Sequence, residues 1–350
     1  MSDQKLEDIY KGVLETIRLY PDQLKQAWDE VTSIDTPDEY KFCDKIVLCG
    51  MGGSALGARV VDSLLVNRIR LPFEIFNQYN IPNYSDDKTL VICYSYSGNT
   101  EETVSALKDA ILRESKVFVI SSGGQLKDIA QEHNLPMYLI DPKYNPSGQP
   151  RNALGYSIGS ILALFKNLEF ATFFPEEIDE AVAAMKAAFN QNDPKNKDIL
   201  AKSLADKIKD KALILVASEH LYGVSHAIKN QFNESAKTFA ALFELPELNH
   251  HLMEGLENPR SLKNDVIFMT LESSLYLERI QARYELTKEI FEKQGYKYIS
   301  YKPLSEKKLS QVFEVLCFGS LIVYYLGRSY GIDPNKIPWV DHFKKKLSEM

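Results

Sequence analysis

The 350-residue chain contains 41 lysine and arginine residues against 48 aspartate and glutamate residues, which gives a formal net charge of −7. That balance excludes the broad basic field on which binding to nucleic acid or an anionic membrane depends, so an anionic ligand must be held by local groups. Chains longer than about 250–300 residues usually divide into more than one domain, so we expect two.

The expected compartment is the cytoplasm. The four cysteines form no CxxC pair, and Cys49 and Cys93 lie in apolar runs, which is typical of reduced core thiols. The N-terminal stretch MSDQKLEDIYKGVLETI is too polar for a signal peptide. The longest apolar stretch, around Val315–Leu326, has the length of a core helix and is too short for a membrane span.

In chain order, the spacing of apolar residues over 5–31 predicts two helices, the second opening at Pro21. Apolar strands then alternate with helices, the pattern of parallel βα units. The predicted strands of this half are Lys45–Cys49, Phe73–Phe76, Thr89–Tyr94, Lys116–Ser121 and Met137–Ile140, with helices over Ser54–Leu65 and Thr100–Glu114.

A turn-rich segment, KYNPSGQPRNALG, precedes helices that we predict between about Tyr156 and Ala188. The polar segment QNDPKNKD then leads, through one more helix, into a second half with the same alternation. Its predicted strands are Ala212–Ala217, Thr238–Glu244, Val266–Leu271 and Tyr296–Tyr301, with helices over Tyr222–Ser235, Leu275–Gln294 and Leu309–Ser329 and a basic helix at the C-terminus.

This organisation predicts an α/β fold of two doubly wound, flavodoxin-like parallel-sheet domains with flanking helices. We expect an active site at the interface between the domains, near the carboxyl ends of the parallel strands. The predicted segments are N-terminal helices over 1–36, a first domain over 37–150, a helical linker over 151–194, a second domain over 195–331 and a C-terminal helix over 332–350.

The turn GMGGS lies between a predicted strand and helix. Gly52, Gly53 and Ser54 can bring backbone N–H groups close to an anion at the helix N-terminus. The turn also satisfies the dinucleotide pattern GxGxxA, but the next strand ends in Asn77 instead of the acidic residue that would bind ribose. Phosphosugar binding is therefore favoured over dinucleotide binding, and a purely structural turn stays open.

A second turn, SYSGNT, follows the strand TLVICY. The hydroxyls of Ser95, Ser97 and Thr100 can donate hydrogen bonds to phosphate oxygens, while Gly98 lets backbone amides approach. The alternative is an ordinary helix cap, but a cap needs one hydroxyl, and this turn has three beside a glycine. No GxxxxGK[ST] occurs in the chain, which disfavours nucleoside triphosphate hydrolysis.

These two turns together resemble the SIS (sugar isomerase) domain. From about residue 40 to the C-terminus, the chain resembles the bifunctional phosphoglucose/phosphomannose isomerase family, which implies that SYSGNT binds the sugar phosphate. The substrate-binding residues implied by the resemblance are Gly52, Gly53, Ser54, Ser95, Ser97, Gly98, Asn99 and Thr100.

The resemblance also implies catalytic residues. In PRNALG, Arg151 stabilises the enediolate oxygens, and in KNQFNESAK, Glu234 is the base that moves a proton between C1 and C2. In ELPELNHHLMEG, His250 opens the sugar ring and, in related dimers, reaches the partner's site. Without the resemblance, the sequence favours a surface arginine at Arg151 and a solvated helix residue at Glu234.

Three positions depart from the family pattern, and one further lysine follows it. His251 and Leu252 stand where Asn-Glu is usual, which puts in doubt any role of the following carboxylate. In IPWVDHFKKKL, Lys344 is the implied ring-opening or substrate-binding lysine. Ile337 stands where the family tends to have threonine, which puts the mannose-phosphate activity in doubt.

The expected activity is therefore isomerisation of glucose 6-phosphate, with mannose 6-phosphate as a second candidate substrate, to fructose 6-phosphate. It needs neither cofactor nor metal, and no histidine spacing suits zinc. The expected partners are the sugar phosphate and a second copy of the chain, with no nucleic acid and no membrane. Two alternatives are a non-catalytic phosphosugar-binding SIS protein and a nicotinamide-dependent oxidoreductase.

Overall fold

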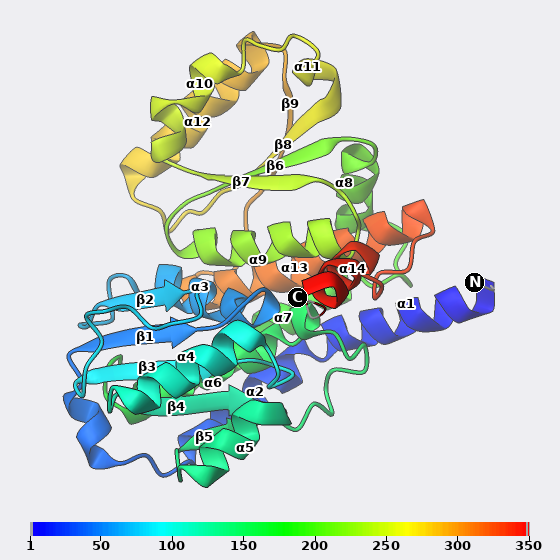
Figure 1. Ribbon diagram of the computed structural model, residues 1–350. Helices are drawn as coiled ribbons and strands as arrows, with labels where there is room; N and C mark the ends of the chain where they lie inside the picture. The colour runs from blue at the N-terminus through cyan, green and yellow to red at the C-terminus, as the bar shows by residue number, and fades with distance from the viewer. Residues whose placement is uncertain (1–2, 348, 350) are drawn as a thin grey trace.

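The computed structural model describes residues 3–347 and 349. Two parallel β-sheets lie one above the other in Figure 1, and a layer of helices lies between them. This arrangement confirms the predicted α/β class with two doubly wound sheets. The domain boundaries themselves stay a prediction.

The first sheet has the strand order β2-β1-β3-β4-β5, and all of its strand pairs are parallel. Because the chain moves from β1 to one side and then crosses to the other, the switch point lies between β1 and β3. The elements are β1 (Lys45–Cys49), β2 (Phe73–Phe76), β3 (Thr89–Tyr94), β4 (Lys116–Ser121), β5 (Met137–Leu139), α3 (Gly53–Leu65), α4 (Glu101–Leu112) and α5 (Gly124–Glu132).

The second sheet has the order β7-β6-β8-β9, again with parallel pairs, so its switch point lies between β6 and β8. Two short helices, α10 and α11, follow β7 and were not predicted. The elements are β6 (Ala212–Ala217), β7 (Ala240–Glu244), β8 (Val266–Leu271), β9 (Lys297–Tyr301), α9 (Tyr222–Glu234), α10 (Leu252–Gly255), α11 (Leu262–Asp265) and α12 (Glu278–Lys293).

The remaining helices flank or separate the sheets. The long helix α13 (Lys308–Tyr330) and helix α9 run between the two sheets, and α14 (Pro338–Leu347) lies on the outside near the same level (Figure 1). The others are α1 (Asp3–Arg18), α2 (Tyr20–Thr32), α6 (Leu154–Asn167), α7 (Pro175–Gln191), α8 (Leu200–Ile208) and the 3-10 turns η1 (Asp38–Phe42), η2 (Pro150–Asn152), η3 (Glu219–Leu221) and η4 (Glu247–His250).

One continuous hydrophobic core joins the two halves. It includes Leu48 of β1, Phe232 of α9 and Phe318 of α13, each at most 1% exposed. A second cluster, with Val47 and Val91, covers the other face of the first sheet beneath α4 and α5. Strands whose two faces are both buried read as near-continuous apolar runs, which is why the sequence located them so closely.

Helix α13 is longer than the apolar stretch that predicted it. It is long and apolar enough to cross a membrane, yet the whole of its most apolar window is buried inside the protein. We therefore interpret it as a core helix, as expected from the sequence. All four cysteines are buried and free, and burial raises the pKa of the Cys317 thiol above its ordinary value.

Candidate active site

The SYSGNT loop connects β3 to α4 at the carboxyl edge of the first sheet. Ser95 is fully buried, and its Oγ shares a hydrogen bond of 2.8 Å with Oγ1 of Thr100. The amide of Gly98 donates to the same Ser95 Oγ at 3.1 Å. The side chains of Ser97 and Asn99 are exposed, so the loop presents polar groups to solvent, while the hydrogen bonds of the buried Ser95 hold its backbone in place.

Helix α4 begins directly after this loop without a side-chain cap. Thr100 occupies the N-cap position, but its side chain makes no capping hydrogen bond and instead contacts Ser95. The amides of the first turn of a helix need an acceptor, and the helix dipole favours an anion there. The helix-cap interpretation of SYSGNT is therefore not supported, and the first turn of α4 stays suited to an anion.

The GMGGS turn lies against this loop. The backbone amide of Tyr96 donates to Oγ of Ser54 at 3.0 Å, which links the two turns directly. Gly52 has φ of 49°, a conformation that favours glycine. A Cβ on Gly53 would lie 3.1 Å from the backbone nitrogen of Arg151, so η2 packs closely on the turn.

Arg151 connects the first domain to the second and to the C-terminal segment. Its side chain is only 3% exposed, and its Nε donates to Oγ of Ser235 at 3.0 Å. Its Nη2 donates to the carbonyl oxygens of Pro334 at 2.6 Å and Asn335 at 3.2 Å. Burial lowers the pKa of Arg151, while the nearby carboxylate of Glu234 acts in the opposite direction.

Glu234 lies at the end of α9 and faces Arg151. Its Oε2 is 3.5 Å from Nη1 of Arg151, and its side chain is 31% exposed, so a ligand can reach it. The side chain of Gln231, one turn earlier, donates to the carbonyl oxygen of Arg151 at 3.1 Å. The structure thus brings together Arg151 and Glu234, which lie far apart in the sequence.

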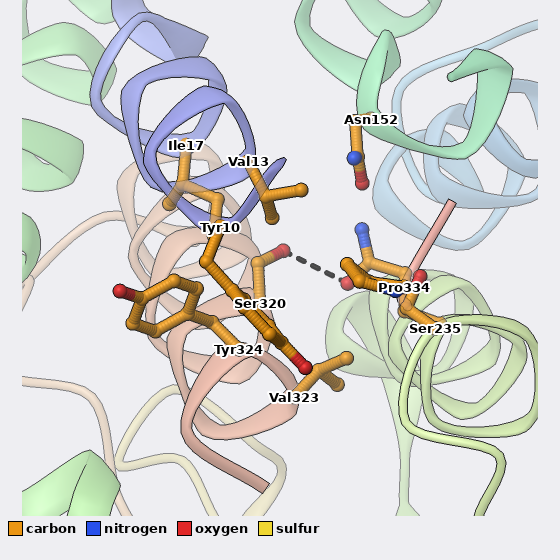
Figure 2. Close-up of a pocket in the computed structure, with 10 residues that line it drawn as sticks. Tyr10, Val13, Ile17, Asn152, Ser235, Ser320, Val323, Tyr324 and Pro334 are labelled. Carbon is orange, nitrogen blue, oxygen red and sulfur yellow. Dashed lines mark hydrogen bonds between the residues drawn. The ribbon is translucent and has the colours of Figure 1, made fainter. Parts of the chain in front are cut away.

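A small cavity lies behind this pair. Its volume is about 10 Å³, about the space of one water, and Figure 2 shows residues of α1, α9, α13 and η2 around it. The dashed line in Figure 2 is the hydrogen bond of 2.8 Å that Ser320 Oγ donates to Gln231 Oε1. This packed wall holds α9, and with it Glu234, at a fixed distance from η2.

The second sheet contributes to this site from its amino edge. Asn233 of α9 exchanges hydrogen bonds with Ala240, the first residue of β7, so Glu234 lies beside the start of that strand. The expectation that the site lies at the carboxyl ends of the strands is therefore wrong for the second sheet. The reason is that α9 runs antiparallel to the strands it connects.

His250 follows the carboxyl end of β7 and is exposed. Since β7 extends over Ala240–Glu244, a strand about 13 Å long separates it from the edge where Glu234 lies. The structure of one chain therefore does not bring His250 together with Glu234 and Arg151.

Comparison with known proteins assigns the chain to a family. Residues 197–347 match the family described as bacterial phospho-glucose isomerase C-terminal SIS domain. A bifunctional phosphoglucose/phosphomannose isomerase from Caldicellulosiruptor bescii is 30% identical over 349 residues, which cover 97% of this chain and 99% of that protein. The chain belongs to the bifunctional phosphoglucose/phosphomannose isomerase family.

Solved structures agree with this family assignment at the level of fold. A hypothetical protein from Thermus thermophilus superposes with a TM-score of 0.75 at 17% identity, covering 99% of this chain and 94% of that one. The tagatose-6-phosphate ketose/aldose isomerase from Escherichia coli gives a TM-score of 0.70 at 17% identity, with 93% and 94% covered.

In this member of the isomerase family, Lys344 lies on α14, where every residue of Pro338–Leu347 is at least partly exposed. Ile337 immediately precedes that helix. Arg151 binds the carbonyl oxygens of Pro334 and Asn335, and Lys237 donates to that of Lys336 at 2.6 Å. The segment leading to α14 is therefore fixed beside the Arg151–Glu234 pair.

Sequence reasoning missed two contributors to the site. The turn after β4 holds the SYSGNT loop, because Ser122 Oγ donates to the carbonyl oxygen of Tyr96 at 2.6 Å and Asn99 Oδ1 accepts from the amide of Gln125. Its sequence SSGG has the same hydroxyl-plus-glycine composition, which was the available signal. Ser235, which accepts from Arg151, carried no such signal.

Proposed function

We propose that this chain interconverts glucose 6-phosphate and fructose 6-phosphate by proton transfer through a cis-enediolate. The observation that carries the proposal is the pair of Arg151 and Glu234, joined across the two domains beside an uncapped, hydroxyl-rich loop. Membership of the isomerase family supports the same reaction. Mannose 6-phosphate is the second candidate aldose, with Ile337 next to the site as the residue that bears on it.

The SYSGNT loop and the first turn of α4 hold the phosphate in this proposal. Hydroxyl and amide donors suit a dianion, and the dipole of a helix of 12 residues adds to the attraction. Ser95, Ser97 and Thr100 provide the alcohols, while the GMGGS turn forms the adjoining wall.

Glu234 then takes the C2 proton of the open-chain aldose and returns it to C1. A partly exposed carboxylate at the end of a helix can reach both carbons of a planar enediolate. Arg151 stabilises the negative charge that develops on the enediolate oxygens, and its fixed hydrogen bonds keep the guanidinium in place before the substrate binds. In this proposal the negative carboxylate of Glu234 accepts the proton, and the positive guanidinium of Arg151 stabilises the enediolate.

We further propose a homodimer in the cytoplasm, in which His250 and Lys344 assist ring opening. The position of His250 at the far edge of β7 is compatible with a role in the site of a second copy of the chain. The exposed Trp339 and Phe343 on α14, at 83% and 64%, support an additional contact of that helix.

The test of this function is the substitution Glu234→Gln. It keeps the size of the side chain and removes the base, so turnover of fructose 6-phosphate should fall at least about a hundredfold with little change in KM. The matched control is Glu132→Gln, at the exposed end of α5, which should keep normal turnover. Turnover by Glu234→Gln close to that of the control would refute the assignment.

One observation favours a second candidate, a phosphosugar-binding protein without catalysis. His251 and Leu252 replace the Asn-Glu of the family pattern. A coupled assay with each aldose 6-phosphate, run with and without chelator, distinguishes an isomerase, which converts the sugar, from a binding protein, which does not. Tight binding with no conversion of either sugar would select the binding protein.

A further inference from the structure

A cavity of about 370 Å³ lies between the domains, away from the Arg151–Glu234 pair. The end of α3 and the residues that follow it, Asn67 and Arg68, form one wall. The second domain forms the other wall, with Glu219 and His220 of η3, and with Lys307 and Lys308 at the N-cap and first position of α13. The volume is within the range of sites for small organic ligands.

The cavity lies at the switch point of the second sheet. Its wall includes residues that follow β6 and residues that follow β8, the two strands between which the chain changes direction. Ligands of doubly wound folds bind in this crevice, outside the carboxyl ends of the strands. It is the same place that the GMGGS and SYSGNT turns occupy on the first sheet.

Three cations line the cavity, each with a carboxylate beside it. Arg68 pairs with Glu177 at 2.9 Å, and Lys308 lies 3.5 Å from Glu219. Lys307 pairs at 2.6 Å with Glu180, which is not part of the wall. With Glu180 counted, the three cations face three carboxylates, so the charges of these side chains balance around the cavity.

The N-terminus of α13 gives this side of the cavity its positive character. The helix has 23 residues, and its N-cap, Lys307, makes no side-chain capping hydrogen bond. Leu309 of the first turn lines the cavity, so the first-turn amides lie at its edge. Unpaired amides and the helix dipole favour an anion such as a phosphate group.

His220 supplies an acceptor of a different kind. Its Nε2 is 2.8 Å from Gln311 Oε1, which can only accept, so Nε2 carries the proton and Nδ1 is an acceptor. Nδ1 has no hydrogen-bond partner among the residues that the structure describes, although the residue is only 1% exposed. An unsatisfied buried acceptor is unfavourable, and because His220 lines the cavity, a shift of its ring on ligand binding would let a hydroxyl donate to Nδ1.

We propose that this cavity is a second ligand site, which binds a small phosphorylated polyol such as a sugar phosphate and bridges the two domains. The phosphate contacts Lys307, Lys308 and the first turn of α13. The hydroxyl groups contact the His220 and Glu219 side. The combination of cationic groups with unpaired and anionic acceptors selects a ligand that carries both an anion and hydroxyl donors.

The experiment measures binding of fructose 6-phosphate by calorimetry in a variant whose SYSGNT loop is disabled by Ser95→Ala and Thr100→Ala. We expect about one equivalent per chain to bind in this variant. Adding Lys307→Ala and Lys308→Ala should weaken that binding at least about tenfold. Adding Lys202→Ala and Lys207→Ala instead, on the exposed face of α8, should not change it.

A second variant guards against misfolding of the lysine double variant. Leu277 lines the cavity yet is 70% exposed, so Leu277→Trp can narrow the entrance without disturbing the core, and it should also weaken binding. Inorganic phosphate and sorbitol, each used alone, should bind at least about tenfold more weakly than fructose 6-phosphate, since each offers half of the contacts.

The proposal is overturned if the loop variant binds no fructose 6-phosphate, or if the lysine and Leu277 substitutions leave its affinity unchanged. Equal affinity for inorganic phosphate would overturn the polyol part. Failure of the proposed isomerase is distinguishable, because it concerns turnover and Glu234. If the loop substitutions do not reduce the number of equivalents bound by the unmodified chain, the phosphate loop is wrong, and the lysine variants still test the cavity.

Discussion

Gly98 is essential to the SYSGNT loop for a reason other than the one its motif suggests. The motif indicates a glycine that admits a ligand to the backbone. In the structure, Gly98 has φ of 72°, and a Cβ there would lie 1.7 Å from the carbonyl oxygen of Gly123. The residue is therefore required by the contact between two loops of the protein, which in turn fixes the shape of the proposed phosphate site.

Gly98→Ala should reduce the free energy of unfolding by at least about 2 kcal/mol, since it adds a left-handed alanine to a steric clash. Urea denaturation measures the change. Gly255→Ala is the control, because a Cβ at Gly255 meets nothing within 4 Å. Similar losses of unfolding free energy in the two variants would show that the close approach of Gly98 to Gly123 does not affect stability.

His220 gives the stability a defined pH dependence. Burial lowers its pKa to about 4, although the hydrogen bond with Gln311 opposes the shift. The unfolded chain takes up a proton below about pH 6.5, whereas the folded chain resists until about pH 4. The free energy of unfolding should therefore fall as the pH decreases from 6.5 to 4.

In His220→Gln, the loss of unfolding free energy between pH 6.5 and pH 4 should be smaller by up to a few kcal/mol. The reason is that each unit by which a pKa is lowered corresponds to about 1.4 kcal/mol. The pKa of the half-buried His226 is also lowered to about 4, mainly by burial, so this residue adds to the pH dependence in the same direction. The measurement is urea denaturation at several pH values. The exposed His133→Gln serves as a comparison, and an unchanged slope in His220→Gln would contradict the prediction.

At the scale of elements, α9 joins the domain interface to the candidate base. At one end of it, Gly223 lies against the backbone of Arg59 in α3, an approach that a Cβ would prevent at 2.0 Å. At the other end, Glu234 meets Arg151. The packing of α9 on the first domain thus determines where the Glu234 carboxylate lies relative to the SYSGNT loop, the proposed phosphate site.

Helix α14 differs from α9 because none of its residues, Pro338–Leu347, is buried, so its packing adds little to the stability of the fold. It nevertheless carries Lys344, a candidate site residue. Because Lys344 is exposed, Lys344→Met should leave the free energy of unfolding within about 0.5 kcal/mol of the parent. Turnover should nevertheless fall at least about tenfold if the lysine helps to bind or open the sugar. Lys346→Met, two residues away on the same helix, should keep normal turnover, and equal effects of both would argue against Lys344.

At the scale of the whole molecule, the separation of His250 from Glu234 requires explanation. Two ends of one strand cannot meet in one site, so a second copy of the chain must supply His250 if it acts on the substrate. If His250 acts on the substrate, the chain can therefore be active only as a dimer.

Mixing two inactive variants tests it. Glu234→Gln and His250→Ala chains, unfolded and refolded together in equal amounts, should recover about one quarter of normal turnover, because half of the dimers are mixed and each has one intact site. Each variant refolded alone provides the control. Absence of recovery, with mixed dimers demonstrated by a tag, would exclude a shared site.

Local patterns in the sequence predicted the strands and the two-sheet class, which the structure confirms, whereas the phosphate-binding role of the SYSGNT loop stays a prediction. Continuous apolar runs such as TLVICY identify strands buried on both faces, and glycine and hydroxyl residues identify the turns after them, because both signals are local. The residues that the resemblance named, Arg151 and Glu234, became a pair only in the folded chain.

How the second domain faces the first becomes visible only in the folded chain. The direction of α9 places Glu234 at the amino edge of its sheet and leaves the carboxyl edge, with His220 and Lys308, to a separate cavity. No local sequence pattern predicts this arrangement of α9 and the second sheet. It depends on which helix faces pack together, and that packing is set by contacts between residues distant in the chain.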